Sequence, residues 1–483
     1  MSVVAKHWID GEWLATGELK ESRNPATYEV IGHYHDGGRE QAEAAIAAAK
    51  RAFAQGDWAR NNVLRADALA LLADRFEAHQ QSFIDMYKLE NGKPEALQEI
   101  SRIAPAIRYW SAMARTLKGE SGHPSPDEIS ITSREPIGVA GIITPWNSPI
   151  ILCMRSVNPA LAAGCTVACK MPGQTAQVST LLAQVFSEVE VLPRGVANFF
   201  NERGSGGAQW LVSSPDTRAI SFTGGTETGA QIAQEAGRLL KRCGLELGGK
   251  NAHLVFEDAD FEQLLPVLRV TAMRFGGQYC EAGSRVIVQR AIYEKVRDAI
   301  AEELRQVRVG PASDPGTELG PLIDKESVER VDGVVRQAAE QGAEVILRGG
   351  PVTDGPLSGG AFFNPAFLAV RDPELPIIQE ETFGPVMTIE AFDDEDEGVR
   401  LVNGTKYGLG GSVWTRDLPR AFRVSEKFET GMVWINEWGK VHYQFEEGGY
   451  KQSGLGRLNG PSALEDFTEI KHITFTTKSP PKS

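Results

Sequence analysis

From about residue 150 onward, β-rich runs alternate with segments whose apolar residues recur at helical spacing. The strand-like TVACK at 166–170 is followed by helical periodicity over 175–190, and VANFF at 196–200 is again strand-like. Strands that alternate with helices are typical of parallel βαβ units, because a crossover helix must return the chain to the same end of the sheet. This alternation predicts an α/β fold.

A second alternating block runs from 251 to about 440, with strands expected at AHLVF, RVIVQ and MVWIN. The chain has 483 residues, more than one ordinary hydrophobic core accommodates. We therefore expect two α/β domains with parallel sheets, and we expect them to meet near residue 249.

The N-terminal part differs from these blocks, because its apolar periodicity predicts helices at 40–57, 63–90 and 97–118. The turn-rich stretch GESGHPSPDEIS then interrupts the pattern, and the strand-like ISITSREPIGVAGIITP follows it. The tail HITFTTK is an alternating strand at the end of the chain. An unpaired edge strand is prone to aggregation, so we expect this tail to pair with the 123–142 ribbon or with another subunit.

The charge balance limits the classes of partner. The chain carries 50 Lys and Arg residues against 64 Asp and Glu residues, for a net charge of −14. Nucleic acids and anionic membranes favour a clustered positive surface, so we expect neither as a partner. No apolar run reaches about 18 residues and the start MSVVAKHWIDGEW lacks a signal-peptide core, so we expect a cytoplasmic protein.

Cysteine and histidine usage predicts neither a disulfide framework nor a metal site. There are only five cysteines, at irregular spacing: Cys153, Cys165, Cys169, Cys243 and Cys280. His33 and His35 lie beside an Asp-Gly-Gly turn without a third ligand at metal spacing. We expect a surface turn there.

Five short motifs carry the chemistry: PWNSP at 145–149, FTGGTETG at 222–229, LELGGKN at 245–251, GQYCEAGSR at 277–285 and EETFGP at 380–385. Each motif alone is common. Together, in this order and over nearly the whole chain, they resemble the aldehyde dehydrogenase family. The resemblance implies oxidation of an aldehyde to its carboxylic acid with NAD or NADP as cofactor.

Cys280 is the nucleophile that this resemblance implies. An aldehyde is planar and cannot release hydride until a nucleophile makes its carbon tetrahedral, and a thiol also gives a thioester that water hydrolyses. A lone cysteine is more often a small buried hydrophobe. Here, however, small residues flank it, at Gly276, Gly277 and Gly283, and leave room for a ligand. The other four cysteines sit in apolar or helical contexts that suit core packing.

Two polar residues complete the implied catalytic set. Asn147 matches the family residue that stabilises the oxyanion together with the backbone N–H of Cys280, although an Asn at this position also suits a helix cap. Glu246 matches the general base that activates water. Its neighbours Leu245 and Leu247 predict a raised pKa, which suits a base near neutral pH. A surface Glu at a strand end is the alternative for Glu246.

The cofactor residues are also implied by resemblance. Gly224 and Gly229 bracket a strand-to-helix turn whose free N–H groups can bind a pyrophosphate. Lys170 matches the residue that contacts the adenosine ribose, and we also include it in the catalytic set. Gly225 matches a contact to the cofactor phosphates, Glu381 the contact to the nicotinamide ribose, and Phe383 the contact to the nicotinamide ring. We expect Trp146 to bind the cofactor as well.

Some positions depart from the family pattern. Gly173 replaces the Glu that commonly binds the ribose hydroxyls, which removes the repulsion of a 2′-phosphate, so the sequence leaves the choice between NAD and NADP open. Gly225 stands where many members have Ser. Glu446 and Glu447 replace a usual Pro-Phe, so the loop on the substrate side is expected to differ in shape.

Arg155 and Arg274 bear on the substrate. They resemble the paired arginines of succinic semialdehyde dehydrogenases, and Arg155 alone resembles the pocket arginine of salicylaldehyde-type enzymes. We therefore expect a semialdehyde or a hydroxylated aromatic aldehyde, because a guanidinium binds a carboxylate or phenolate well. Glu281 leaves other readings open, namely an internal ion pair with either arginine and a cationic or general aliphatic aldehyde. The other expected substrate contacts are Tyr279, Ile151, Trp438 and His442.

The resemblance also implies an organisation. We expect a cofactor-binding domain over 1–117 and 137–248, a catalytic domain over 249–461, and an oligomerisation element over 118–136 and 462–483. A homodimer or homotetramer is expected. Two rival functions stay open, a non-catalytic protein that retains the fold and a reductase that forms aldehydes from activated acyl groups. Intact Cys280, Asn147 and Glu246 weigh against the first, and Glu246 weighs against the second.

Overall fold

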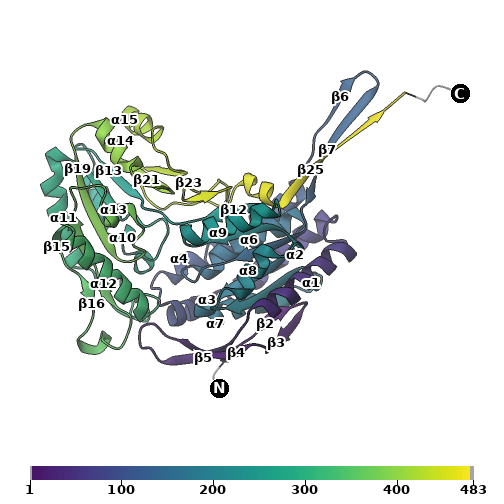
Figure 1. Ribbon diagram of the computed structural model, residues 1–483, viewed down its shortest axis with the longest axis horizontal. Coiled ribbons are helices and arrows are strands. Elements are labelled where there is room, and N and C mark those ends of the chain that lie inside the picture. Colours follow the sequence, from purple (N-terminus) through teal and green to yellow (C-terminus); the bar gives the residue numbers. More distant parts are fainter. Residues whose placement is uncertain (1–2, 479–483) are drawn as a thin grey trace.

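The computed structural model describes residues 3–478 and contains two large, mostly parallel sheets with helices on both faces of each (Figure 1). The predicted α/β class is confirmed. The last residues of the expected C-terminal element, 479–483, lie outside the described residues.

The first sheet has eight strands, of which the five central ones are parallel. In spatial order they are β24 (Gly454–Leu455), β12 (Arg242–Glu246), β11 (Thr217–Thr223), β8 (Val139–Ile143), β9 (Thr166–Pro172), β10 (Ala197–Glu202), β2 (His7–Ile9) and β3 (Glu12–Leu14). The central strands are buried on both faces, which explains their near-continuous apolar sequences.

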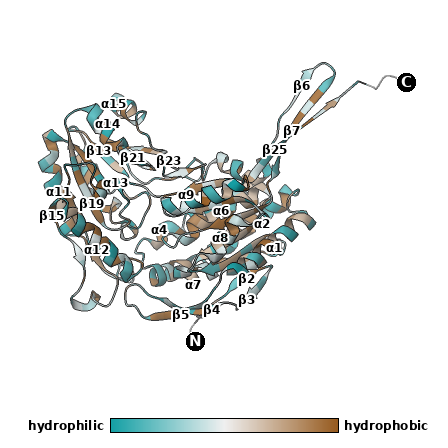
Figure 2. Cartoon of the chain, in the orientation of Figure 1, coloured by the Kyte–Doolittle hydropathy of each residue, from teal (hydrophilic) through white to brown (hydrophobic). Residues whose placement is uncertain are grey.

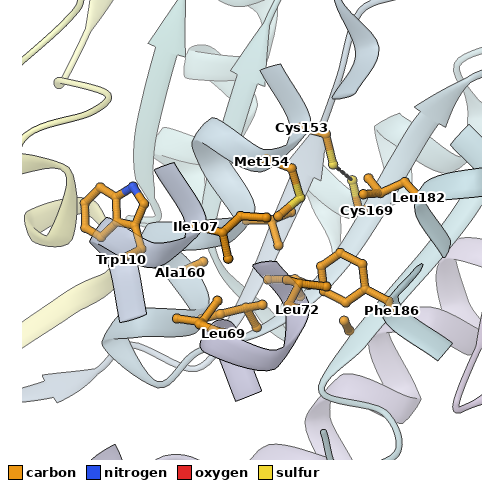
Figure 3. Packing of buried hydrophobic residues seen from close by; sticks show 14 of the residues in the cluster. Leu69, Leu72, Ile107, Trp110, Cys153, Met154, Ala160, Cys169, Leu182 and Phe186 are labelled. Carbon is orange, nitrogen blue, oxygen red and sulfur yellow. Dashed lines mark hydrogen bonds between the residues drawn. The ribbon is translucent and has the colours of Figure 1, made fainter. Parts of the chain in front are cut away.

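Helices cover both faces of this sheet. One face packs against α1 (Arg39–Gln55), α8 (Gly206–Ser213) and α9 (Thr226–Arg238). The other face packs against α2 (Asn62–Ala78), α5 (Ile103–Thr116), α6 (Pro149–Ala163) and α7 (Ala176–Ser187). The core on this second face is apolar, and the thiols of Cys153 and Cys169 face one another in it (Figure 3).

The second sheet has seven strands, all parallel except at one edge. In order they are β15 (Glu344–Leu347), β18 (Ala366–Ala369), β19 (Val386–Phe392), β14 (Arg285–Gln289), β13 (Ala252–Val255), β21 (Gly410–Trp414) and β22 (Met432–Ile435). One face packs against α10 (Phe261–Thr271) and α11 (Tyr293–Arg305). The other packs against α12 (Lys325–Glu340), α13 (Pro376–Gln379), α14 (Glu395–Asn403) and α15 (Leu418–Ser425).

A three-stranded ribbon projects away from the two sheets (Figure 1). It consists of β6 (Ser121–Ser125), β7 (Glu128–Pro136) and β25 (Thr468–Thr476), with β25 antiparallel to β7. The predicted pairing of the C-terminal strand with the ribbon is therefore confirmed. Part of the ribbon is coloured as hydrophobic (Figure 2).

Smaller strand pairings complete the structure. The strands β1 (Val3–Ala5), β5 (Val30–Asp36) and β4 (Glu18–Arg23) form a sheet. Two further sheets of two short antiparallel strands are β16 (Gly350–Pro351) with β17 (Phe363–Asn364) and β20 (Tyr407–Gly408) with β23 (Tyr450–Lys451). His33 and His35 lie within β5, so the surface turn expected there is wrong. Among the described residues, no group of three metal-ligating side chains comes together.

Two of the three predicted N-terminal helices are interrupted. The segment 63–90 divides at His79, whose backbone leaves the helical region and whose imidazole contacts Glu188 at 2.9 Å. After it come α3 (Gln80–Met86) and a turn of π-helix at Tyr87–Asn91. The segment 97–118 divides into α4 (Ala96–Ile100) and α5, with Pro105 in the first turn of α5, where a missing N–H costs nothing.

The domain boundaries stay predictions, but two strand assignments bear on them. The strand β24 pairs with β12, so a segment that we placed in the second domain returns to the first sheet. The stretch 119–130, expected as a turn-rich break, contains the strand β6. None of the helices within 3–478 is long and apolar enough to cross a membrane, and the cytoplasmic location stays a prediction.

Candidate active site

Cys280 follows a tightly wound turn. Phe275, Gly276 and Gly277 all have positive φ, which is unfavourable for the non-glycine Phe275 and costs on the order of 1–3 kcal/mol. A Cβ on Gly277 would lie 2.3 Å from the backbone of Gly384. Only glycine fits there, so the chain can pass close to the neighbouring loop and direct Cys280 into the space between the two sheets.

The backbone of Cys280 is anchored from the second sheet. The side chain of Asn251 donates to the carbonyl oxygen of Cys280 at 2.8 Å. A Cβ on Gly249 would lie 2.6 Å from the same oxygen, so the Gly-Gly pair after Glu246 permits this close approach. The motif LELGGKN thus brings the predicted base and the predicted nucleophile together.

The Sγ of Cys280 lies 3.8 Å from Oε2 of Glu246, which accepts a hydrogen bond from the thiol. Burial raises the pKa of Cys280 well above its usual value, and the carboxyls of Glu246 and Glu281 add to this effect. The resting side chain is therefore a neutral thiol. Its ionisation requires a base, and Glu246 is placed to serve.

Glu246 is the last residue of β12 and is 1 % exposed. Burial raises its pKa, as the flanking leucines predict, and Arg155 opposes that shift. Oε1 of Glu246 has no hydrogen-bond partner in the structure. The surface-residue alternative for Glu246 is therefore wrong, and this free oxygen is available to a water molecule or substrate.

Asn147 lies in the loop between β8 and α6. Its Nδ2 donates to the backbone carbonyl of Gln278 at 3.1 Å, two residues before Cys280. The residue at the N-cap of α6 is Ser148, so Asn147 does not cap this helix as the alternative would require. The loop is held by Asn91, whose side chain donates to the carbonyl of Trp146 at 2.8 Å.

Two cavities meet at this point. Asn147 and Cys280 line both. Glu246 lines one of them, while Arg155 and Glu447 line the other. A reactant in each cavity would therefore reach the thiol from opposite sides.

The first cavity contains the predicted cofactor residues Trp146, Gly224, Gly225, Glu381 and Phe383. A Cβ on Gly225 would meet nothing within 4 Å, so open space lies over the N-terminus of α9, where helical N–H groups lack intrahelical partners. The rings of Trp146 and Phe383 meet edge to face at 5.7 Å. This open cavity, which faces the positive end of the α9 helix dipole, fits a dinucleotide.

Glu381 is half-buried, and this desolvation raises its pKa to about 7; its Oε1 accepts a hydrogen bond from the N–H of Gly249 at 3.1 Å. Gly229 has a different environment, because a Cβ there would lie 2.3 Å from Leu247. Gly229 therefore allows α9 to pack closely on the β12 end and does not line the cavity.

Lys170 lines neither cavity. It is near the end of β9, where burial lowers its pKa and the carboxylates of Glu202 and Asp36 oppose that shift. We therefore retain Lys170 as a predicted cofactor contact only. Gly173 lies just beyond it, and a Cβ there would lie 2.8 Å from the backbone nitrogen of Arg203 and 2.9 Å from Oη of Tyr34.

The second cavity contains both predicted arginines, in contrasting states. Arg155 forms ion pairs with Glu246, at 3.0 Å, and with Glu447, so the internal ion pair left open from the sequence is present. Arg274 forms no ion pair with any described carboxylate, and its Nε has no hydrogen-bond partner. Its guanidinium lies 5.0 Å from the ring of Phe275 and 5.7 Å from that of Tyr279.

Of the other predicted substrate contacts, Ile151, Tyr279 and Glu281 line this second cavity. Trp438 and His442 do not. Trp438 lies behind the catalytic loop and donates from Nε1 to the carbonyl of Glu281 at 3.0 Å.

Several lining residues were missed from the sequence: Glu99, Arg102, Ile103, Ala106, Trp110, Asn158, Tyr443, Asn459, Ser327 and Arg330. They lie on helices and loops whose local patterns indicate only amphipathic packing or exposure. Glu447 did carry a signal, since it was a departure from the family pattern, but its role as the second partner of Arg155 had no sequence signature.

Comparison with known proteins gives a consistent result. The model of the aldehyde dehydrogenase family matches residues 13–473. The chain is 37 % identical over 477 residues to betaine aldehyde dehydrogenase of Bacillus subtilis (strain 168), covering 98 % of this chain and 97 % of that protein. It is 36 % identical over 481 residues to 2-hydroxymuconic semialdehyde dehydrogenase of Pseudomonas sp. (strain CF600), covering 97 % of this chain and 98 % of that protein.

A solved structure agrees over the whole fold. Betaine aldehyde dehydrogenase from Staphylococcus aureus in complex with NAD+ superimposes with a TM-score of 0.96 at 35 % identity, over 99 % of this chain and 95 % of that one. The motifs, the paired cavities and these relatives lead to one conclusion: the chain belongs to the aldehyde dehydrogenase family and is an NAD(P)-dependent aldehyde dehydrogenase.

Proposed function

We propose that this enzyme oxidises an aldehyde that carries a second, anionic group, as a semialdehyde does, through a thioester on Cys280. The observation that carries the substrate class is Arg274, a cavity-lining guanidinium without a carboxylate partner among residues 3–478. The carboxyl of Glu95 acts on Arg274 electrostatically but forms no ion pair with it. The carboxylate of a substrate would supply the direct, hydrogen-bonded partner that the guanidinium lacks.

The other charges of the substrate cavity support the same class. Arg102 also lines it, and its guanidinium donates a hydrogen bond to the carbonyl oxygen of Val441. Burial raises the pKa of Glu281 to about 8, so this carboxyl is protonated near neutral pH, hydrogen-bonded with Tyr279. Glu99 is paired with Lys93 at 2.8 Å.

The names of two relatives indicate different classes of substrate. One is named 2-hydroxymuconic semialdehyde dehydrogenase, which agrees with an acidic substrate. Another is named betaine aldehyde dehydrogenase. A cationic aldehyde in this cavity would face Arg102 and Arg274, while the carboxylates of Glu246 and Glu447 are already occupied by Arg155. The charge arrangement therefore favours the semialdehyde.

A hydroxylated aromatic aldehyde is the second candidate. Four aromatic side chains line the same cavity: Trp110, Phe275, Tyr279 and Tyr443. They offer flat apolar surface to an aromatic ring, and Arg274 would then bind a phenolate oxygen.

In the proposed reaction, Glu246 accepts the proton of the Cys280 thiol and the resulting thiolate forms a C–S bond with the aldehyde carbon. The carbonyl π-electrons move to oxygen, and Asn147 can rotate its amide from Gln278 to donate to that oxygen. One positioned donor of this kind contributes about 3–4 kcal/mol to transition-state stabilisation.

An NAD(P) cofactor held by the α9 N-terminus, Glu381 and Phe383 supplies the hydride acceptor that converts the cysteine adduct into a thioester. Glu246 then releases its first proton to solvent and acts a second time as a base. It takes a proton from a water molecule while the water oxygen bonds to the acyl carbon, and collapse of the adduct releases the acid and the Cys280 thiolate.

The substrate class is tested by comparing an acidic semialdehyde with a neutral aldehyde of the same chain length. In Arg274→Met, kcat/KM for the acidic aldehyde should fall about 10–100-fold, because a charge-assisted hydrogen bond is lost. The value for the neutral aldehyde should change less than about threefold. Arg274→Lys, which retains the charge, should recover part of the loss.

Two further variants complete this experiment. Cys280→Ala should abolish turnover of every aldehyde, which tests the thioester route independently of the substrate. Arg290→Met, which removes an exposed pair with Asp393, is the matched control for loss of an arginine. Equal losses on both aldehydes in Arg274→Met, or highest activity with betaine aldehyde, would contradict the anionic substrate.

We also propose that the ribbon assembles copies of this chain into a dimer or tetramer. Ile131 and Ile473 are cross-strand partners and are 38 % and 49 % exposed, and Phe475 beside them is 45 % exposed. A projecting apolar ribbon of this kind is suited to contact with another subunit.

A further inference from the structure

A single guanidinium joins two carboxylates beside the catalytic thiol. Nη2 of Arg155 donates to Oε2 of Glu246 at 3.0 Å, and Nη1 donates to Oε1 of Glu447. The three residues are 7 %, 1 % and 4 % exposed. Both carboxylates come from parts of the chain distant from Arg155 in the sequence.

We propose that Arg155 and Glu447 are positioning residues that set the location and basicity of Glu246. In this arrangement Arg155 holds the carboxylate of Glu246 within reach of Cys280, and Glu447 shares the guanidinium so that Glu246 stays basic enough to accept a proton. The inference rests on the proposed role of Glu246 as general base, and it adds two residues that do not touch the reacting atoms.

The geometry explains why Arg155 is needed. Oε2 of Glu246, the oxygen that Arg155 binds, is also the one that accepts from the Cys280 thiol at 3.8 Å. Oε1 has no protein partner. Arg155 thus fixes one oxygen toward the thiol and leaves the other free for water.

The electrostatics point the same way. The charged and titratable groups that the described residues bring to Glu246 are Arg155, Glu447, Glu281, Glu381 and Cys280. Arg155 is the cation of this set and the rest are acids. Burial raises the pKa of Glu246, and Arg155 opposes the rise most strongly, with a smaller contribution from the thiol of Cys280. Without the guanidinium, Glu246 would retain its proton near neutral pH and could not act as a base.

Glu447 supplies the opposing effect. Its backbone is held by two hydrogen bonds with Leu458, both 2.7 Å, and Oε2 accepts from Nδ2 of Asn459 at 2.6 Å. This rigid carboxylate competes with Glu246 for the same guanidinium. If it were neutral, Arg155 would act on Glu246 alone, and the more strongly paired carboxylate would be a weaker base.

The two residues therefore have opposite signatures in the pH profile of deacylation, in which activity rises as Glu246 loses its proton. Arg155→Gln should move this rise to higher pH by roughly one unit or more and lower kcat near neutral pH about tenfold. Glu447→Gln should move the rise to lower pH and reduce the plateau of kcat severalfold, because the base is weaker. The double variant should return the rise toward its wild-type position.

The measurement is kcat against pH with a neutral aldehyde, so that the substrate has no charge of its own, in the full enzyme with saturating NAD(P). Arg155→Lys should restore most of the wild-type profile, which a purely structural loss would not do. Arg290→Gln, in an exposed ion pair with Asp393, is the matched control and should leave the profile unchanged. Thermal unfolding confirms that each variant is folded.

Glu246→Gln separates failure of the inference from failure of the proposed function. If that variant keeps the alkaline rise, Glu246 is not the base. If it loses the rise, but Arg155→Gln and Glu447→Gln shift it in the same direction or not at all, the positioning pair is refuted. Should Arg155→Gln fail to fold, Glu447→Gln alone decides, because its side chain keeps the size and hydrogen-bonding shape of glutamate.

Discussion

The thiol of Cys280 and the carboxylate of Glu246 lie 3.8 Å apart, one on a strained loop of the second sheet and the other at the end of β12 in the first. The proposed nucleophile and its proposed base are therefore supplied by different sheets. Any movement of one sheet against the other changes this distance, while the hydrogen bond from Asn251 to Cys280 holds the loop to its own sheet.

Glu246→Gln should lower kcat by roughly 10²–10⁴-fold, the usual contribution of a positioned general base. Because burial and neighbouring acids keep Cys280 protonated, acylation should also slow near neutral pH. At alkaline pH the thiol ionises without help, so a rapid burst of NAD(P)H should return while steady turnover stays slow. Stopped-flow absorbance of NAD(P)H measures both phases, and wild-type steady turnover in this variant would contradict the assignment.

The affinity for an acidic aldehyde should depend on the protonation of Glu281. Burial, with a contribution from Glu447, raises its pKa to about 8, so the carboxyl is neutral below that pH and negative above it. KM for the acidic aldehyde should therefore rise about threefold to tenfold as pH increases through 8, because the new charge repels the substrate carboxylate. Steady-state kinetics measures this rise.

Glu281→Gln provides the control for that dependence, since its side chain cannot ionise. The rise of KM should disappear in this variant, and KM for a neutral aldehyde should be insensitive to pH in both proteins. The same rise in Glu281→Gln as in the wild type would assign the effect to another group.

Gly173→Glu should not convert the enzyme to a typical NAD-preferring form, although it restores the carboxylate that the family commonly has. A Cβ at this position would lie 2.8 Å from the nitrogen of Arg203 and 2.9 Å from the hydroxyl of Tyr34. Overpacking of this kind destabilises by about 1–3 kcal/mol. We expect a lower Tm and a higher KM for both NAD and NADP.

Gly237→Ala is the matched control for that substitution. It lies in α9, and its Cβ would meet nothing within 4 Å, so Tm should stay constant or rise slightly. An unchanged Tm together with tighter NAD binding in Gly173→Glu would show that the backbone near Arg203 yields more easily than the packing indicates.

Ile473→Asp should weaken self-association through the ribbon, raising the dissociation constant of the assembly by about 100-fold or more. Ile473 and its partner Ile131 lie on one face of the ribbon, and Thr474 lies on the other because adjacent strand residues alternate. Thr474→Asp therefore adds the same charge to the opposite face. Light scattering should show a smaller mass for Ile473→Asp only, and unchanged mass in both variants would exclude this apolar face as the contact.

Much of the molecule follows from short-range patterns. The alternation of strand and helix predicted both parallel sheets, and the alternating tail predicted a strand that pairs with the ribbon, as β25 does with β7. The flanking leucines predicted the raised pKa of Glu246. Apolar periodicity did not reveal the helix break at His79. There a contact with Glu188, more than one hundred residues away in the sequence, accompanies the change of backbone conformation.

The resemblance of five short motifs to the aldehyde dehydrogenase family was enough to select Cys280, Asn147 and Glu246, and the structure places all three around one cavity. The ion-pair partner of Arg155 could not be predicted from neighbouring residues. Its partner Glu447 lies 292 positions away, and the two meet only because β24 returns the chain to the edge of the first sheet beside β12. Whether a buried arginine binds a substrate or an internal carboxylate depends on which charges the packed sheets bring within about 4 Å, because a desolvated guanidinium without a close partner is costly.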